Sequence, residues 1–249
     1  MRELSLFSGA GGGLLGSKLL GWECVGYVEF NDYCQRVIAQ RIKDGILDEA
    51  PIFGDIRGFI KSGAAREYRV FADVVTAGFP CQPFSVAGKS LGEDDERNMW
   101  PETIAVIRQV RPRWLLLENV PGIIVHPYFG TILGDLSESG FDVRWTVLGY
   151  GDIGGVHIGR RLWMVAKANE DNGTPNGEVH IKPDNEIHLW GRSSWPSLQD
   201  ADKTWLLSSS LIVPKDHGMA RYVDEFEAIG NGQVPIVAKT AWEILSGGI

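Results

Sequence analysis

The sequence has few cysteines, no long apolar run and fewer basic residues than acidic ones. Its three cysteines, Cys24, Cys34 and Cys81, form no CxxC pair, which argues against a disulfide framework and a cysteine zinc site. No stretch approaches the roughly 18 apolar residues of a membrane span, and the apolar run at the N-terminus is too short for a good signal peptide. We therefore expect a protein of a reducing compartment that needs neither a membrane nor a metal.

The acidic balance restricts the choice of partners. The formal net charge is −8, whereas binding to phosphate backbones is driven by lysine and arginine. A nucleic-acid partner would need a local basic face on an acidic protein. The 249 residues, 44% of them hydrophobic, suit one domain, or one domain with a small appendage, and a sizeable core.

Short apolar runs alternate with amphipathic ones along the first two thirds of the chain. This alternation predicts an α/β fold whose mostly parallel sheet carries helices on both faces. Ligands of such sheets bind at the carboxyl ends of the strands. The predicted strands cover residues 3–7, 24–29, 51–56, 70–78, 113–118, 143–150 and 161–167, and the predicted helices cover 13–21, 32–42, 100–110, 128–140 and 234–245.

A glycine-rich loop follows the first predicted strand. Gly11, Gly13 and Gly16 match the GxGxxG pattern, and Glu29 ends the second strand, where an acid commonly accepts hydrogen bonds from ribose hydroxyls. The alternative is a tight structural turn with an incidental glutamate. Asp55, after the short third strand, has two readings, an acceptor for an adenine amino group or a helix N-cap.

Cys81 follows the fourth predicted strand and Glu118 ends the fifth. Both side chains are expected at one carboxyl-end crevice. A thiolate nucleophile needs a nearby positive charge, which Arg160 or Arg161 could supply, and a buried carboxyl group with a raised pKa can donate a proton near neutral pH. The alternative for Cys81 is a small buried apolar residue, although the prolines around "CQ" favour a fixed loop.

Six blocks now resemble one family, the DNA cytosine-5 methyltransferases, over nearly the full length of the chain. The blocks are "LFSGAGGGLLG", "VEFNDYCQ", "GDI", "GFPCQPFSVAGK", "ENVPG" and "YVDEFEAIGNGQVPIVA". The resemblance implies a Rossmann-like S-adenosylmethionine-dependent methyltransferase fold with a small irregular recognition subdomain. It also implies methyl transfer to carbon 5 of a flipped-out cytosine in double-stranded DNA.

The resemblance assigns roles residue by residue. Cys81 would add to carbon 6 of the base, Glu118 would protonate ring nitrogen 3, and Arg161 would contact the target base. Cofactor contacts are implied for Phe7, Ser8, Gly9, Ala10, Gly11, Gly12, Glu29, Phe30, Asp55, Ile56, Phe79, Pro80, Trp100, Asn231 and Gly232. Substrate or DNA contacts are expected for Gln82, Ser85, Asn119, Val120, Arg160, Arg192 and Arg221.

The sequence departs from the family in two places. Gly159 stands where an arginine is common, with Arg160 one position over. The expected recognition segment, 168–222, is short and has more acidic than basic residues. It would separate a catalytic and cofactor-binding domain, 1–167, from a C-terminal segment, 223–249, that returns to that domain.

These departures keep two alternatives open: a tRNA cytosine-5 methyltransferase, and a catalytically weak S-adenosylmethionine- or DNA-binding protein that needs a partner. We expect a monomer in the cytoplasm of a prokaryotic cell or a phage-infected host. Restriction-modification, phage self-protection and an orphan regulatory role are all compatible with the sequence.

Overall fold

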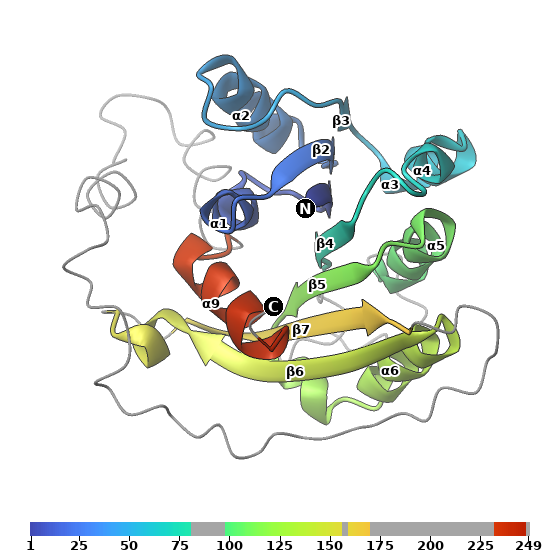
Figure 1. Cartoon of the computed structure of the whole chain (residues 1–249), viewed down its shortest axis with the longest axis vertical. Coiled ribbons are helices and arrows are strands. Elements are labelled where there is room, and N and C mark those ends of the chain that lie inside the picture. Colours follow the sequence, from blue (N-terminus) through green and yellow to red (C-terminus); the bar gives the residue numbers. More distant parts are fainter. Residues whose placement is uncertain (81–97, 156–158, 170–231, 248–249) are drawn as a thin grey trace.

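One sheet organises the chain, with its strands in the order β3-β2-β1-β4-β5-β7-β6 (Figure 1). The computed structural model describes residues 1–80, 98–155, 159–169 and 232–247. Strands β1 to β5 are parallel, and β7 runs antiparallel to both β5 and β6. The predicted mostly parallel sheet is confirmed. The strands are β1 (Arg2–Leu6), β2 (Glu23–Val28), β3 (Ile52–Phe53), β4 (Val74–Gly78), β5 (Trp114–Asn119), β6 (Phe141–Gly149) and β7 (Arg160–Ala168).

Helices cover both faces of this sheet. The apolar core on one face includes residues of α3 to α6, whereas α1, α2 and α9 contribute to the clusters on the other face. The helices are α1 (Gly12–Leu19), α2 (Asp32–Lys43), α3 (Ile56–Lys61), α4 (Ala64–Glu67), α5 (Trp100–Val110), α6 (Tyr128–Glu138) and α9 (Pro235–Leu245), with 3-10 turns η3 (Pro121–Val125) and η4 (Tyr150–Ile153). None of these helices is long and apolar enough to cross a membrane.

The clearest differences from the sequence-based expectation lie between β2 and β4. The third strand is only Ile52–Phe53, shorter than the predicted 51–56. The short helices α3 and α4 were not predicted, because four to six residues are too few to establish a helical period. Together these two helices carry the chain from β3 at the sheet edge to the start of β4.

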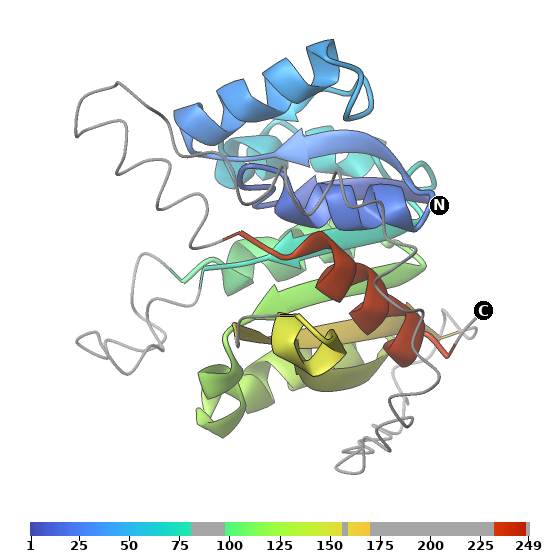
Figure 2. The ribbon, with the colours of Figure 1, turned by 90° about the vertical axis from the view of Figure 1, so that its left-hand side faces the viewer.

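Helix α9 lies beside α1 although more than two hundred residues separate them (Figure 2). Gly16 allows this close approach, because a Cβ there would lie 2.9 Å from both the Ala238 Cβ and the Pro235 carbonyl oxygen. The Trp242 ring packs against Trp22, at a centroid distance of 4.7 Å, and Trp114, at 5.2 Å. The expected recognition segment lies outside the described residues except for its first two positions.

Candidate active site

A cavity of about 430 Å³ opens at the carboxyl ends of β1, β2, β4 and β5. It is bounded by the loop after β1, by the start of α1, and by the two residues Gly232 and Gln233. This is the edge at which α/β sheets bind ligands. The sequence-predicted residues that line it are Phe7, Ser8, Gly9, Ala10, Gly12, Glu29, Phe30, Phe79, Pro80, Glu118, Asn119, Val120, Arg161 and Gly232.

Other predicted site residues lie outside the described part of the chain. They are Cys81, Gln82, Ser85, Arg192, Arg221 and Asn231. Cys81 directly follows Pro80, which lines the cavity. The peptide bond between them ties the expected nucleophile to the rim of this site.

The loop between β1 and α1 has an unusual backbone. Phe7 adopts a left-handed conformation with φ of 53°, and Gly9 and Gly11 follow with φ of 55° and 89°. For a bulky residue such as Phe7 this conformation costs on the order of 1–3 kcal/mol, and such strain is concentrated at functional sites. The Arg41 guanidinium holds the loop by donating to the Ala10 carbonyl oxygen at 2.6 Å.

Glu29 fixes the same loop from the end of β2. Its Oε2 accepts a hydrogen bond from the Gly9 amide at 2.6 Å, and its Oε1 accepts one from the Asn31 amide at 2.7 Å. The side chain of Asn31 in turn caps α2. A carboxylate oxygen can accept more than one hydrogen bond. Glu29 therefore keeps acceptor capacity for a ligand hydroxyl while its orientation is set by two backbone amides.

The first two residues of α1 have no room for side chains. A Cβ at Gly12 would collide with the Gln233 carbonyl oxygen, and a Cβ at Gly13 would collide with Gln233 Oε1. Gly78, at the end of β4, is restricted in the same way, because a Cβ there would lie 2.8 Å from Gln233 Nε2 and 2.9 Å from Glu118 Oε2. Gln233 thus lies against three glycines from two parts of the site, against Gly12 with its main chain and against Gly13 and Gly78 with its side chain.

Glu118 is a buried acid in the cavity, and its pKa is shifted towards neutral pH. It is the penultimate residue of β5, with 9% of its surface exposed, and its Oε1 lies 3.1 Å from Arg161 Nε on the neighbouring strand β7. Burial raises the pKa of Glu118 to about 7, while Arg161 and, less strongly, Gln233 oppose that rise. A carboxyl group with this pKa can both donate and accept a proton near neutral pH.

Asn119 secures the chain that leads to Cys81. Its Nδ2 donates to the Phe79 carbonyl oxygen at 3.0 Å, and its Oδ1 accepts from the Val120 amide at 2.8 Å. With 2% of its surface exposed, Asn119 ties the end of β5 to the segment after β4. The residue expected to shape the base pocket therefore also fixes the approach to the nucleophile loop.

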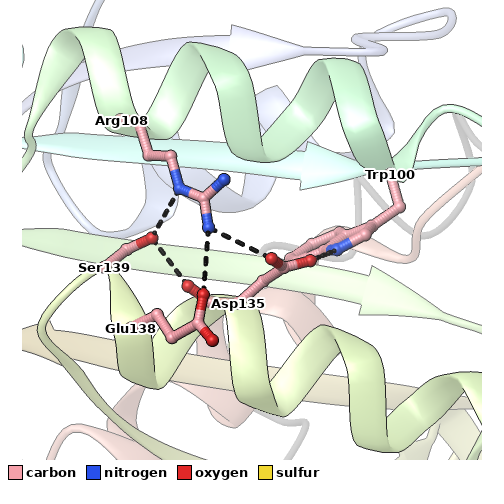
Figure 3. A network of polar contacts seen from close by, with 5 residues as sticks. All are labelled: Trp100, Arg108, Asp135, Glu138 and Ser139. Carbon is pink, nitrogen blue, oxygen red and sulfur yellow. Dashed lines mark hydrogen bonds and ion pairs between the residues drawn. The ribbon is translucent and has the colours of Figure 1, made fainter.

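Trp100 lies behind the cavity and is not one of its lining residues. It is buried, its Nε1 donates to Asp135 Oδ2 at 2.8 Å, and its ring packs on Phe79 at a centroid distance of 5.2 Å. Asp135 also accepts from Arg108, which joins α5 to α6 (Figure 3). The structure thus gives Trp100 a supporting position behind Phe79, and its contact with the cofactor stays a prediction.

Four more predicted residues are also absent from the cavity lining. Asp55 is exposed and caps α3 by accepting from the Arg57 amide at 2.9 Å, which is the second of its two readings. Ile56 is a core residue. Arg160 pairs with Asp152 at 2.8 Å, so it does not face Glu118 in place of the arginine that the sequence lacks at position 159. The remaining residue is Gly11, at the N-cap of α1.

Among the polar residues of the site that the sequence analysis did not single out are Gln233 and Glu3. Gln233 stands between the expected Gly232 and the proline that begins α9, so its place in the C-terminal block was the available signal. Glu3 lines the inner end of the cavity within β1, is 1% exposed, and accepts from Thr76 Oγ1 at 2.6 Å. An acid within an apolar strand was the signal in that case.

Comparison with known proteins agrees with this geometry. Residues 1–211 match the family model for C-5 cytosine-specific DNA methylases. The type II methyltransferase M.NgoMIV of Neisseria gonorrhoeae is 30% identical over 223 residues, which cover 85% of this chain and 67% of that protein. M.NgoBI of the same organism is 34% identical over 66% of this chain. M.HaeII of Haemophilus aegyptius is 33% identical over the same share. The chain spans about half the length of the latter two relatives.

Solved structures support the fold. A putative DNA modification methyltransferase encoded within an Escherichia coli prophage aligns with a TM-score of 0.53 and 24% identity, covering 68% of this chain and 47% of that one. A mutant of Spodoptera frugiperda DNMT2 aligns with a TM-score of 0.52 and 23% identity, covering 68% and 50%. The sheet is that of the Rossmann-like S-adenosylmethionine-dependent methyltransferases. By its sequence match, the chain belongs to the C-5 cytosine-specific DNA methylase family.

Proposed function

We propose that this protein methylates carbon 5 of cytosine in double-stranded DNA, with S-adenosylmethionine as the donor and Cys81 as a covalent nucleophile. The observation that carries the proposal is the ion pair between the buried Glu118 and the partly exposed Arg161. This pair lies in the same cavity as Pro80, the residue before Cys81. A binding protein would need neither a buried carboxyl group with a pKa of about 7 nor a cysteine directly after Pro80 in the sequence.

The cavity suits S-adenosylmethionine in size and in donor set. Its volume of about 430 Å³ falls within the range of ligand pockets. Gly9, where a Cβ would meet nothing within 4 Å, leaves its backbone open to a ligand. Glu29 presents an oriented carboxylate to ribose hydroxyls, and Phe30, with 78% of its surface exposed at the edge, offers a flat apolar face. The bound cofactor would supply an electrophilic methyl group.

The residues of the chain account for the rest of the reaction. The Cys81 thiolate forms a bond to carbon 6, while Glu118 gives its proton to ring nitrogen 3 so that no charge accumulates on the ring. Carbon 5 then takes the methyl group. A base removes the proton from carbon 5, the bond to Cys81 breaks and its electrons return to the sulfur as thiolate, the carbon 5–carbon 6 double bond returns, and ring nitrogen 3 gives its proton back to Glu118. A cytosine within a duplex cannot be reached in this way, so the base must be flipped out.

Recognition of the duplex is assigned to the segment 168–222, with Arg192 and Arg221 as phosphate contacts. The support for this assignment is its place between β7 and the C-terminal segment 223–249, which includes α9. Arg161 would contact the flipped base from the cavity side, since its guanidinium already faces Glu118.

Covalent trapping tests the function directly. The protein and S-adenosylmethionine are incubated with mixed-sequence duplex DNA that contains 5-fluorocytosine, which blocks removal of the carbon 5 substituent, and in parallel with tRNA carrying the same base. Mass spectrometry under denaturing conditions should detect an adduct on DNA in the wild type and none in C81A, whose cofactor affinity should stay unchanged.

The other outcomes separate the alternatives. An adduct on tRNA alone would replace DNA by tRNA as the substrate. Cofactor binding without an adduct on either nucleic acid would identify a weak or partner-dependent protein. An adduct that persists in C81A would remove Cys81 as the nucleophile.

A further inference from the structure

We infer that Gln233 is a positioning residue. It would fix the orientation of the Glu118 carboxyl group and connect it to residues 7–13, the loop after β1 and the start of α1, here called the cofactor loop. The inference rests on the proposed function and concerns the same site. It gives a role to a side chain that comes from the segment before α9, 115 residues after Glu118.

The contacts of the Gln233 amide define this role. Nε2 donates a long hydrogen bond, 3.4 Å, to Glu118 Oε2. Arg161 Nε lies 3.1 Å from the other carboxylate oxygen, Oε1. Donors from two different elements therefore hold both oxygens of Glu118. An amide nitrogen can only donate a hydrogen bond, so Gln233 can bond to the Glu118 carboxylate only when Nε2, and not Oε1, faces it.

The other end of the amide faces the cofactor loop. Gln233 Oε1 lies so close to Gly13 that a Cβ there would collide with it, and the main-chain oxygen of Gln233 restricts Gly12 in the same way. Both glycines belong to the first turn of α1 and line the cavity. Any shift of this turn on cofactor binding has to move Gln233, and Gln233 carries the shift to Glu118.

Glycine at position 78 leaves the space that this bridge needs. Gly78 pairs with Glu118 in the register between β4 and β5. A Cβ at Gly78 would come within 3 Å of both Gln233 Nε2 and Glu118 Oε2. The strand end thus accommodates the contact between the amide and the carboxylate, and a larger residue at position 78 would push the two groups apart.

Three variants test the role. Q233M keeps the length of the side chain and removes its donor. Q233E keeps the oxygen towards Gly13 and places a second carboxylate beside Glu118. V234A is the matched control, because Val234, at the N-cap of α9, is partly buried against the core cluster and its truncation loosens the same segment without removing the amide. Circular dichroism and thermal unfolding establish that each variant is folded.

The first measurement needs neither substrate nor activity. The titration of Glu118 is followed by carbon-13 NMR of glutamate carboxyl groups, with E118Q identifying the signal. Since the Gln233 donor lowers the pKa of Glu118, Q233M should shift the titration to higher pH and Q233E should shift it further. V234A should leave it unchanged. An unchanged titration in Q233M, or an equal shift in V234A, would overturn the inference.

The second measurement is the pH dependence of single-turnover methyl transfer. In Q233M the rate should fall about tenfold, as expected when a catalytic group is displaced, and its alkaline limb should move to higher pH together with the NMR titration. A rate equal to that of the wild type would show that the contact does not position Glu118 for catalysis. If the wild type itself transfers no methyl group, the proposed function fails, whereas the NMR result still decides the contact.

Discussion

Arg161 Nε lies 3.1 Å from Glu118 Oε1 across the boundary between the antiparallel strands β7 and β5. Two effects act in opposite directions on the pKa of Glu118. Burial raises the pKa of Glu118 to about 7, and the guanidinium of Arg161 opposes the rise. The balance leaves a carboxyl group that is poised to exchange a proton near neutral pH.

Replacing Arg161 by methionine should raise the pKa of Glu118. Without the guanidinium the pKa of Glu118 rises above 7, so the alkaline limb of the pH–rate profile moves to higher pH. The maximal rate should fall at least about tenfold, since the carboxyl group loses a partner that orients it. Single-turnover kinetics between pH 5.5 and about 9.5 measure both effects.

R160M is the matched control for R161M. Arg160 pairs with Asp152 near the surface, and its side chain is 58% exposed, so its removal should leave the pH–rate profile in place. A shift of the same size in R160M would mean that general surface charge, and not the pair with Glu118, controls the profile.

Replacing Glu118 by glutamine should remove the proton donor while keeping the shape of the side chain. We expect the single-turnover rate to fall by roughly 10²–10⁴-fold, the usual contribution of a positioned general acid. The dependence of the residual rate on a group with a pKa of about 7 should disappear. Calorimetry should show unchanged cofactor affinity, and a rate within threefold of the wild type would exclude Glu118 as the acid.

Glu3 should make the stability of the protein depend on pH. Burial raises its pKa from 4.5 to about 7, so the folded protein retains a proton that the unfolded chain releases. Its favourable contribution is complete below pH 4.5 and is lost as the pH rises through about 7. E3Q should therefore be more stable than the wild type at pH 8.5, by up to about 3 kcal/mol, and nearly equal to it at pH 4.5.

Urea unfolding at the two pH values measures this difference. E23Q is the control, since Glu23 is exposed at the start of β2 and should change little at either pH. A stability difference between E3Q and the wild type that is the same at both pH values would show that Glu3 does not titrate in this range.

Replacing Trp100 by phenylalanine separates a supporting role from a cofactor contact. W100F loses the hydrogen bond to Asp135 and leaves a partly buried acceptor with one partner fewer, so the free energy of unfolding should fall by about 1–3 kcal/mol. Cofactor affinity should be unchanged, because Trp100 lies behind Phe79. A clear loss of affinity at normal stability would restore Trp100 to the cofactor site.

E138Q tests the outer part of the same network. Arg108 also faces Glu138, at 3.9 Å, but the Glu138 side chain is 79% exposed. Exposed ion pairs contribute roughly 0–1 kcal/mol. E138Q should therefore unfold within about 0.5 kcal/mol of the wild type.

Local patterns in the sequence were sufficient to predict the sheet and the edge of the sheet at which the site lies. The apolar runs predicted β1, β2, β4 and β5, and the acids Glu29 and Glu118 at strand ends indicated the crevice between them. Parallel neighbours bring such positions together whatever the loops do. The family resemblance added the assignment of S-adenosylmethionine and cytosine to that crevice.

The positions of other residues depend on contacts between distant parts of the chain. Nothing near Gln233 in the sequence indicates that its amide reaches Glu118. Asp55 read equally well as a ligand contact and as an N-cap, because both use an acid after a strand, and only the start of α3 shows the N-cap. Trp100 begins a helix whose inward face could not be assigned before α6 and Asp135 were placed.

The packing of α9 against α1 has a consequence for how the protein is made in the cell. The cofactor loop leaves the ribosome early, but Gln233 and the Trp242 contact with Trp22 and Trp114 arrive only with the last part of this chain. Pairing segments so far apart in sequence is slow compared with local folding. A nascent or truncated polypeptide that lacks α9 would thus have an incomplete cofactor site, and methylation would begin only after translation has passed residue 245.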